Sequence, residues 1–360
     1  MKKIYFLTTF IVILSIPIFV FFFGRENKLE VKEKEKDEEL FLLTWEGYIS
    51  ENIIKNFEKE YEISVHIDTV KSSDEVLPIL QSSSQKYDLI LIEDSLVYLF
   101  KELKFLGEID KKNIPNLVFL KDELKINPYD PFNKFCIPYN KGFTGIIVNK
   151  KHVDDFDGTR NILFNEKYKR KISMPNMPEE VLINALFYLG YSINFPTKEQ
   201  LDEALELVKN QKKLEILYQD PIKQREDLVN ENVWIAYAFS TEFLPVKNLN
   251  PNLKFFPLKE GVLLWTDNWC LLSDAPHKKA SHLFLNFILD PEINAKNAKD
   301  VGILPVVNGA EKFLSEEFKE TLESVFFLEE DILKKSQYFF SRNNPEIVKI
   351  LFQISQEFKI

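Results

Sequence analysis

Strand-like and helix-like segments alternate along most of this chain, and this alternation restricts the folds that it can adopt. Residues 40–44, 63–67 and 87–92 read as strands, and a helix-like segment follows the first and the third of them. Strands that alternate with helices through short links predict a parallel sheet with crossover helices, in which ligands bind beyond the carboxyl ends of the strands. Trp45 and Glu93 fall at that edge, which makes them candidate ligand contacts.

The alternation restarts after a glycine-punctuated strand at residues 142–149, which is of the kind that can pass between domains. Residues 172–174 then read as a strand, and Pro178 opens a helix with Glu180 in its first turn. Thr197 begins a second helix with a capping box. Further strands are expected at residues 233–239 and 253–258, and further helices at residues 280–289, 291–299, 311–325 and 345–358. The expected fold class is therefore α/β.

Residues 259–272 place one carboxylate between two indoles. Asp267 lies two residues from both Trp265 and Trp269, so the three side chains project to the same face of a strand. Such a face can neutralise an ammonium group and cover its alkyl stem, and each cation–π contact contributes about 0.5–2 kcal/mol. The alternative is that both tryptophans are core residues and that Asp267 belongs to a turn beside Asn268.

Size and charge limit the classes of function. The chain has 360 residues, of which 45% are hydrophobic and 28% charged, and this is enough for two globular domains with a core each. The formal net charge is −10 at pH 7, and no basic patch with interleaved aromatic residues occurs that could follow a phosphate backbone. We therefore expect no nucleic-acid partner, and an acidic binding protein suits a cationic ligand.

The chain lacks the sequence motifs of common metal sites and hydrolases. Its four histidines are scattered, and it contains no His-Glu-x-x-His, Cys-x-x-Cys, Gly-x-Ser-x-Gly or phosphate-binding glycine loop. Residues 154–158 resemble the start of a calcium loop but lack its length and closing glutamate, so we interpret them as a turn. We expect no metal, no cofactor and no enzymatic activity. The only two cysteines, Cys136 and Cys270, are compatible with a disulfide or with two buried thiols.

The N-terminus predicts export. Residues 4–23 are twenty almost uninterrupted apolar residues after two lysines, which is typical of a signal sequence or a membrane anchor in residues 1–24. No small-x-small cleavage site precedes Gly24, and this favours an anchoring helix. The lysines would keep the N-terminus in the cytoplasm and place the remaining chain outside. Residues 25–39 are nearly all Lys, Glu and Asp and read as a solvated tether.

Several short motifs follow one another in the order found in one known family. They are Trp45-x-x-Tyr48, Tyr-Asp-Leu at 87–89, Ile-Pro-Tyr with a glycine at 137–142, Val-Asn at 148–149, Glu-Val at 180–181, Leu-Gly-Tyr-Ser at 189–192, Lys-Glu-Gly and Trp-x-Asp at 259–267, Asn-Phe-Ile-Leu-x-Pro at 286–291, and Gly302 with Asn308. No single motif is specific, but their collinearity is. On these motifs, residues 40–312 resemble the spermidine/putrescine-binding family of extracytoplasmic solute-binding proteins of ABC importers.

The resemblance implies a two-lobed periplasmic-binding-protein fold, with two parallel or mixed sheets, flanking helices and hinge strands between the lobes. Lobe one would comprise residues 40–139 and 268–312, and lobe two residues 140–267 and 313–360. The ligand would lie in the cleft, and the lobes would close over it. Cys136 and Cys270 would lie on adjacent crossing strands, where a disulfide could join them.

The resemblance also implies a pocket with aromatic rings around the methylene chain of a polyamine and acids at its amines. The candidate ligand-binding residues are Trp45, Glu46, Tyr48, Glu93, Glu180, Trp265 and Asp267. This chain departs from the family pattern at Gly47, at Asn176-Met177, at Ala238, at Ile303 and at Glu93-Asp94-Ser95. These departures leave the ligand open. Packing explanations also exist, because an acid such as Glu180 suits the first turn of a helix and Asp94 suits an N-cap.

The function implied is that of an extracytoplasmic, periplasmic solute-binding protein that captures a polyamine and delivers it to an ABC permease. We expect a monomer, held at the inner membrane by residues 4–23. Two alternatives stay open. The same fold could bind an amino acid or another metabolite, or the protein could be an anchored sensor or interaction protein that is not engaged in transport.

Overall fold

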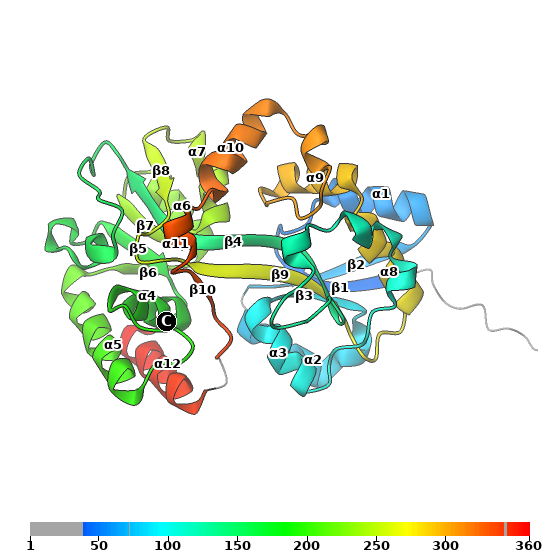
Figure 1. The fold of residues 1–360 in the computed structure, drawn as a ribbon, viewed down its shortest axis with the longest axis horizontal. Coiled ribbons are helices and arrows are strands. Elements are labelled where there is room, and N and C mark those ends of the chain that lie inside the picture. Colours follow the sequence, from blue (N-terminus) through cyan, green and yellow to red (C-terminus); the bar gives the residue numbers. More distant parts are fainter. Residues whose placement is uncertain (1–38, 72, 342–343) are drawn as a thin grey trace, which may run out of the picture. The chain divides into compact units, whose positions relative to one another are not determined.

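A computed structural model describes residues 39–71, 73–341 and 344–360 of the chain (Figure 1). The predicted hydrophobic helix at residues 4–23 and almost all of the charged tether lie outside the described residues. Within the described part, no helix is long and apolar enough to cross a membrane. The compact unit that contains the described residues begins at Asp37.

Ten strands form one hydrogen-bonded network in the described residues. They are β1 (Glu39–Trp45), β2 (Ser64–Val70), β3 (Leu89–Glu93), β4 (Cys136–Asn149), β5 (Ile172–Pro175), β6 (Leu217–Gln219), β7 (Ile235–Phe239), β8 (Leu253–Phe256), β9 (Leu263–Leu271) and β10 (Gln337–Tyr338). Their order is β2-β1-β3-β9-β4-β7-β5-β6, with β8 on β4 and β10 on β9. β1 is parallel to β2 and β3, and β5 is parallel to β6 and β7, whereas β9 and β4 are antiparallel to their neighbours in this order. The predicted α/β class is confirmed, whereas the two expected sheets are joined into one network because β4 pairs with both β7 and β9.

The helices connect and flank these strands. They are α1 (Glu51–Tyr61), α2 (Val76–Ser83), α3 (Asp94–Glu102), α4 (Pro178–Tyr188), α5 (Lys198–Gln211), α6 (Pro221–Val229), α7 (Phe243–Lys247), α8 (Lys278–Ile288), α9 (Pro291–Val301), α10 (Glu316–Phe326), α11 (Glu330–Leu333) and α12 (Pro345–Phe358). The local sequence determines where several of these helices begin. Ser50 caps α1 through the backbone N–H of Asn52, and the predicted capping box of Thr197 and Gln200 is present at α5.

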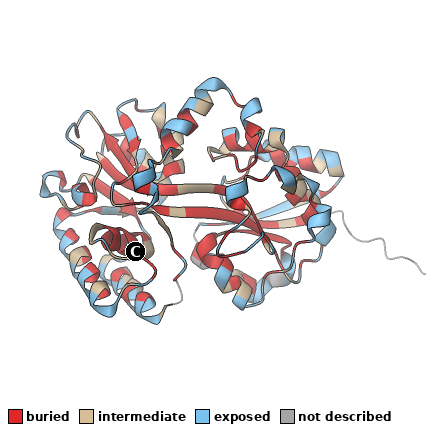
Figure 2. Ribbon diagram, viewed as in Figure 1, coloured by how far each residue is buried: buried red, intermediate tan, exposed pale blue. Residues whose placement is uncertain are grey.

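The apolar residues gather into two cores, and Figure 2 shows β4 and β9 buried along most of their length. The first core is built on β1 and β3 with α1, α3, α8 and α9, and the second on β5 and β7 with α4, α5 and α12. Tyr139 and Trp269 belong to the first core, and Phe143 and Leu263 to the second, so β4 and β9 contribute to both. Leu322, from the segment predicted for lobe two, packs in the first core. The predicted lobe boundaries stay a prediction.

β4 and β9 run side by side from one core to the other (Figure 1). Cys136 and Cys270 are partners in this pairing, with their Cα atoms 4.0 Å apart, and they are joined by a disulfide. Further along, Gly142 lies opposite Trp265, and a Cβ atom at Gly142 would lie within 2.6 Å of the hydroxyl oxygen of Ser240 and would overlap the indole. The indole of Trp265 can therefore lie across β4 only because residue 142 has no side chain.

Candidate functional site

Four of the predicted site residues meet where strands of the first core end. β3 pairs with β9 so that Glu93, the last residue of β3, lies opposite Asp267. Trp45 ends the neighbouring strand β1, and its ring meets that of Tyr48 edge to face at a centroid distance of 5.4 Å. The edge identified from the strand–helix alternation thus carries aromatic rings and acids together, as expected for parallel strands that end at one side of a sheet.

Asp267 is a buried acid that accepts a hydrogen bond from one side chain of the described residues. Only 7% of the residue is exposed, and the hydroxyl of Tyr48 donates a hydrogen bond to its Oδ2 atom. Burial raises the pKa of Asp267 to about 7, the hydrogen bond from Tyr48 lowers it, and the charge of Glu93 raises it further. Near neutral pH this carboxyl group is therefore close to its titration midpoint, and a nearby cation would favour its ionised form.

Asp94 adds a third acid to this edge. It is the first residue of α3, it is buried, and its Oδ2 atom accepts a hydrogen bond from the backbone N–H of Thr266 at 3.2 Å. Burial, followed by the charges of Glu93 and Asp267, raises its pKa well above the ordinary range. The sequence suggested Asp94 as the cap of this helix, but Glu93 occupies the N-cap position, and Asp94 was not among the predicted site residues. Its position directly after Glu93 was the signal that could have included it.

Glu180 brings an acid from the second core. It is the third residue of α4, only 6% of it is exposed, and its Oε2 atom has no hydrogen-bond partner among the described residues. Burial raises its pKa to about 8, with further contributions from the charges of Glu179 and Glu93, whereas Tyr237 and Arg160 lower it. The influence of Glu93 on Glu180 means that the start of α4 lies within electrostatic range of the end of β3.

Two buried residues near Glu180 were not predicted as part of the site. Tyr237, on β7, donates its hydroxyl hydrogen to the Oγ1 atom of Thr144 at 2.9 Å. Arg160 is completely buried and donates from Nε to Asn184 at 3.0 Å and from Nη1 to the carbonyl oxygen of Gly261 at 2.8 Å. No sequence motif marks either residue, because a lone arginine in a connecting segment is usually a surface residue.

The two tryptophans of β9 have different surroundings. Trp265 is 9% exposed and meets Phe239, the last residue of β7, edge to face with ring centroids 6.0 Å apart. Trp269 has no exposed surface and packs between Tyr139 and Phe284 in the first core. The alternation of side chains along a strand cannot separate these two environments, because the strand passes from one core to the other between them.

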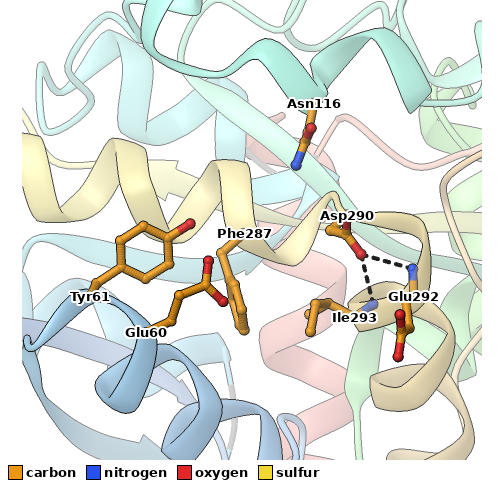
Figure 3. Close-up of a pocket in the computed structure, with 7 residues that line it drawn as sticks. All are labelled: Glu60, Tyr61, Asn116, Phe287, Asp290, Glu292 and Ile293. Carbon is orange, nitrogen blue, oxygen red and sulfur yellow. Dashed lines mark hydrogen bonds between the residues drawn. The ribbon is translucent and has the colours of Figure 1, made fainter.

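Glu46 is exposed in the turn that follows β1, next to Gly47 with its positive φ of 69°, whereas the other predicted ligand-binding residues are buried or half-buried. A pocket of 270 Å³ lies on the first core, lined by residues of α1, α8 and α9, by Asp290 before α9 and by Asn116 of the segment Pro115–Phe119 (Figure 3). None of the predicted site residues lines it. Its Asp290 is already engaged as the cap of α9, through the backbone N–H groups of Glu292 and Ile293. Within the described ranges, no group of three or more His, Cys, Asp or Glu residues is arranged to hold a metal ion.

Comparisons with known proteins agree with this architecture. Residues 52–323 match the family described as bacterial extracellular solute-binding protein. The putrescine/agmatine-binding protein of Pseudomonas aeruginosa is 27% identical over 319 residues, which cover 80% of this chain and 86% of the relative. The spermidine/putrescine-binding periplasmic protein of Escherichia coli is 27% identical over 288 residues, which cover 77% of this chain and 80% of the relative. A solved structure from Listeria monocytogenes, assigned to a spermidine/putrescine ABC transporter, has a TM-score of 0.82 and 27% identity and covers 90% of this chain and 99% of its own.

These findings confirm the family resemblance that the collinear motifs predicted, and they confirm a fold of the periplasmic-binding-protein type. The family match spans most of the chain and includes β3, β4, α4 and β9, which carry most of the site residues described above. This chain belongs to the family of bacterial extracellular solute-binding proteins.

Proposed function

We propose that this protein captures a polyamine of the spermidine or putrescine type between its two lobes and delivers it to an ABC permease. The relatives named for putrescine, agmatine and spermidine binding support this ligand class, as does the ABC transporter assignment of the Listeria structure. The proposal includes an extracytoplasmic location, a monomeric state, binding without catalysis, and an anchor formed by residues 4–23.

The observation that carries the proposal is the group of buried acids contributed by both cores. Asp267 and Glu180 are almost fully buried, and burial raises the pKa of the first to about 7 and of the second to about 8. Such shifts mean that the negative charges are poorly compensated inside the protein. A ligand with two or more ammonium groups would supply the missing positive charge at both acids.

The aromatic residues suit the remainder of such a ligand. Trp45 and Tyr48 meet edge to face beside the acids, and Trp265 is held across β4 in contact with Phe239. Indole and phenol rings bury the methylene groups between the amines and attract the adjoining positive charges. We therefore assign charge neutralisation to Asp267 and Glu180, with Glu93 as a further acid, and coverage of the alkyl chain to Trp45, Tyr48 and Trp265. Glu46, exposed in the turn after β1, is a further acid of this proposed site.

Capture requires that the ligand bind one arrangement of the lobes better than another. A polyamine that touches acids of both cores gains all its contacts only when the lobes are close, and this difference in affinity would shift the population toward the closed form. The closed form would then be the state that the permease recognises.

Isothermal titration of the purified protein with spermidine, spermine and putrescine tests this proposal. We expect saturable binding of at least one of them, accompanied below pH 8 by release of protons from Asp267 and Glu180. Proton release is measured by repeating the titration in buffers with different ionisation enthalpies. No binding of any of the three at millimolar concentration would contradict the polyamine assignment.

One observation favours a second candidate, an amino acid as the ligand. The Nη2 atom of Arg160 is buried without a hydrogen-bond partner in the described structure, and a guanidinium group suits a carboxylate. The same buried acids would then hold the amino group. Binding of α- or ω-amino acids by the wild-type protein, retained in Asp267→Ala, would favour this candidate over a polyamine.

A further inference from the structure

Asn140 connects three segments of the first core at the start of the crossing between the cores. It lies in β4 at the register shift that follows Pro138, and it has no exposed surface. Its Oδ1 atom accepts a hydrogen bond from the backbone N–H of Leu304 at 3.2 Å, and its Nδ2 atom donates to the hydroxyl oxygen of Tyr48 at 2.5 Å. The Tyr48 hydroxyl in turn donates to Asp267.

The direction of this chain of hydrogen bonds follows from its first member. A backbone N–H can only donate, so the atom of Asn140 next to Leu304 must be the carbonyl oxygen, and its amide nitrogen must face Tyr48. The amide nitrogen can also only donate, which leaves the single hydroxyl hydrogen of Tyr48 for Asp267. The tyrosine remains protonated because burial, and then the charge of Asp267, raise its pKa well above the ordinary range.

We propose that Asn140 is a positioning residue for the ligand site, which commits the hydroxyl hydrogen of Tyr48 to Asp267 and so holds this carboxylate as an acceptor facing a cationic ligand. The inference rests on the proposed function for the identity of the ligand. It does not rest on it for the hydrogen-bond chain, which exists in the protein alone.

A second chain of hydrogen bonds, through Asn297 and Tyr139, ends on a different kind of acceptor from the chain through Asn140. The backbone N–H of Ser50 donates to Asn297, which donates to Tyr139, whose hydroxyl donates to the backbone carbonyl of Tyr48 at 2.6 Å. This chain ends on a backbone carbonyl and secures the position of the loop. The chain through Asn140 ends on an ionisable carboxylate, so its loss should alter the charge of the site as well as its geometry.

The titratable groups that act on Asp267 define the expected effect. Glu93 lies opposite Asp267 in the pairing of β3 with β9. Asp94 and Tyr139 are within electrostatic range of Asp267, and Tyr48 donates a hydrogen bond to it. Burial and Glu93 raise the pKa of Asp267, and the hydrogen bond from Tyr48 is the interaction that lowers it. If Asn140 no longer directs that hydrogen bond, the pKa of Asp267 should rise.

The first experiment needs no ligand. Thermal unfolding of the full-length protein in detergent is followed from pH 5 to 9. Wild type, Asn140→Leu and Asn294→Leu are each measured with and without the additional substitution Asp267→Asn. The difference in stability within each pair reports the titration of Asp267. Asn294 is the matched control, because it is buried and accepts from the backbone N–H of Val306 at 3.2 Å in the same segment as Leu304. We expect a midpoint near 7 in wild type and in Asn294→Leu, and a midpoint raised by about one pH unit in Asn140→Leu.

The second experiment uses spermidine as the probe in a double-mutant cycle. We expect Asn140→Leu to weaken binding about tenfold, and to have no further effect once Tyr48→Phe has removed the hydroxyl through which it acts. If Asn140→Leu does not fold, Asn140→Ser replaces it, because serine is too short to reach both Leu304 and Tyr48.

An unchanged Asp267 midpoint in Asn140→Leu, or an equal rise in Asn294→Leu, would overturn the inference. Additive effects of Asn140→Leu and Tyr48→Phe on spermidine affinity would overturn it as well. If wild type binds no polyamine, the proposed function fails, whereas the midpoint measurement still decides the role of Asn140.

Discussion

Two buried acids, Asp130 just before β4 and Asp267 within β9, differ in the donors of their hydrogen bonds. Asp130 has 1% of its surface exposed and accepts hydrogen bonds from the backbone N–H groups of residues 134, 135 and 136. Asp267 has 7% exposed, and its recorded donor is the movable hydroxyl of Tyr48. Burial raises the pKa of both groups, but for Asp130 three backbone donors oppose the shift.

The difference separates an acid that serves the fold from one that is available to a ligand. Asp130 fixes the segment that enters β4, immediately before the disulfide of Cys136, and has little capacity left for another partner. Asp267 and Glu180 are left with poorly compensated charge in a buried position, which is costly to a protein without a ligand. Changes near Cys136 should therefore alter stability without altering affinity, whereas changes at the site acids should alter affinity.

The largest effect is expected from loss of the disulfide. Cys136 and Cys270 are 134 residues apart in the sequence, and a cross-link over so long a loop stabilises a protein by about 4–5 kcal/mol in the chain-entropy description. We expect Cys136→Ala/Cys270→Ala to lower the free energy of unfolding by about this amount in urea titrations. Spermidine affinity of the folded fraction should change less than threefold, and a larger loss would show that the disulfide also shapes the site.

Replacement of Asp130 should have the next largest effect on stability. Asp130→Ala leaves three backbone N–H groups of the buried loop without their acceptor, which costs about 2–4 kcal/mol. Urea titration measures this loss, and isothermal titration should again find affinity close to that of wild type. Glu108→Ala, which removes an exposed ion pair with Lys134, is a suitable control and should cost less than about 1 kcal/mol.

Asp267→Asn should chiefly weaken ligand binding. Removal of one partner of a buried charge pair costs about 2 kcal/mol or more, so spermidine affinity should fall at least about 30-fold while the protein stays folded. Binding should also lose part of its dependence on pH near 7, where the wild-type carboxyl group titrates. Unchanged affinity would remove Asp267 from the site and weaken its contrast with Asp130.

The last prediction concerns how the stability of the protein depends on pH through Glu180. Its pKa is about 8 in the folded protein against 4.5 for an ordinary glutamic acid, so the folded state holds this proton more tightly than the unfolded state. The stability that it contributes is complete below pH 4.5 and is lost as the pH rises to about 8. We expect Glu180→Gln to be more stable than wild type at pH 8.5 in the absence of ligand, with no gain at pH 4. Equal stabilities at pH 8.5 would mean that Glu180 is better compensated than its surroundings indicate.

Much of the fold could be predicted from the sequence because it depends on local patterns. The strand at residues 87–92, the proline-initiated α4 and the capping box of α5 all follow from short-range preferences. The edge carrying Trp45 and Glu93 followed from the strand–helix alternation alone. The lobe-two assignment of the whole segment after residue 312 did not anticipate that Leu322 packs in the first core, because the pattern of a helix does not say which of two cores it covers.

The site was less predictable where a residue acts through tertiary contacts. Asn140 matters because the register of β4 shifts beside it, and no local pattern encodes the position of Leu304 or Tyr48 relative to it. Arg160 gains its role from burial against α4 and the segment that enters β9. Trp269 and Trp265 share a strand face in the sequence pattern, and only the passage of β9 between two cores assigns one to packing.

The missing side chain at Gly142 has a consequence for how ligand preference can change in this lineage. The indole of Trp265 occupies the space that any side chain at residue 142 would need, and Ser240 bounds it from another direction. A larger residue at position 142 would displace the indole, and a smaller residue at position 265 would leave a void above the glycine. Positions 142, 240 and 265 therefore form a single unit of variation, because a larger residue at position 142 would require smaller side chains at both 240 and 265.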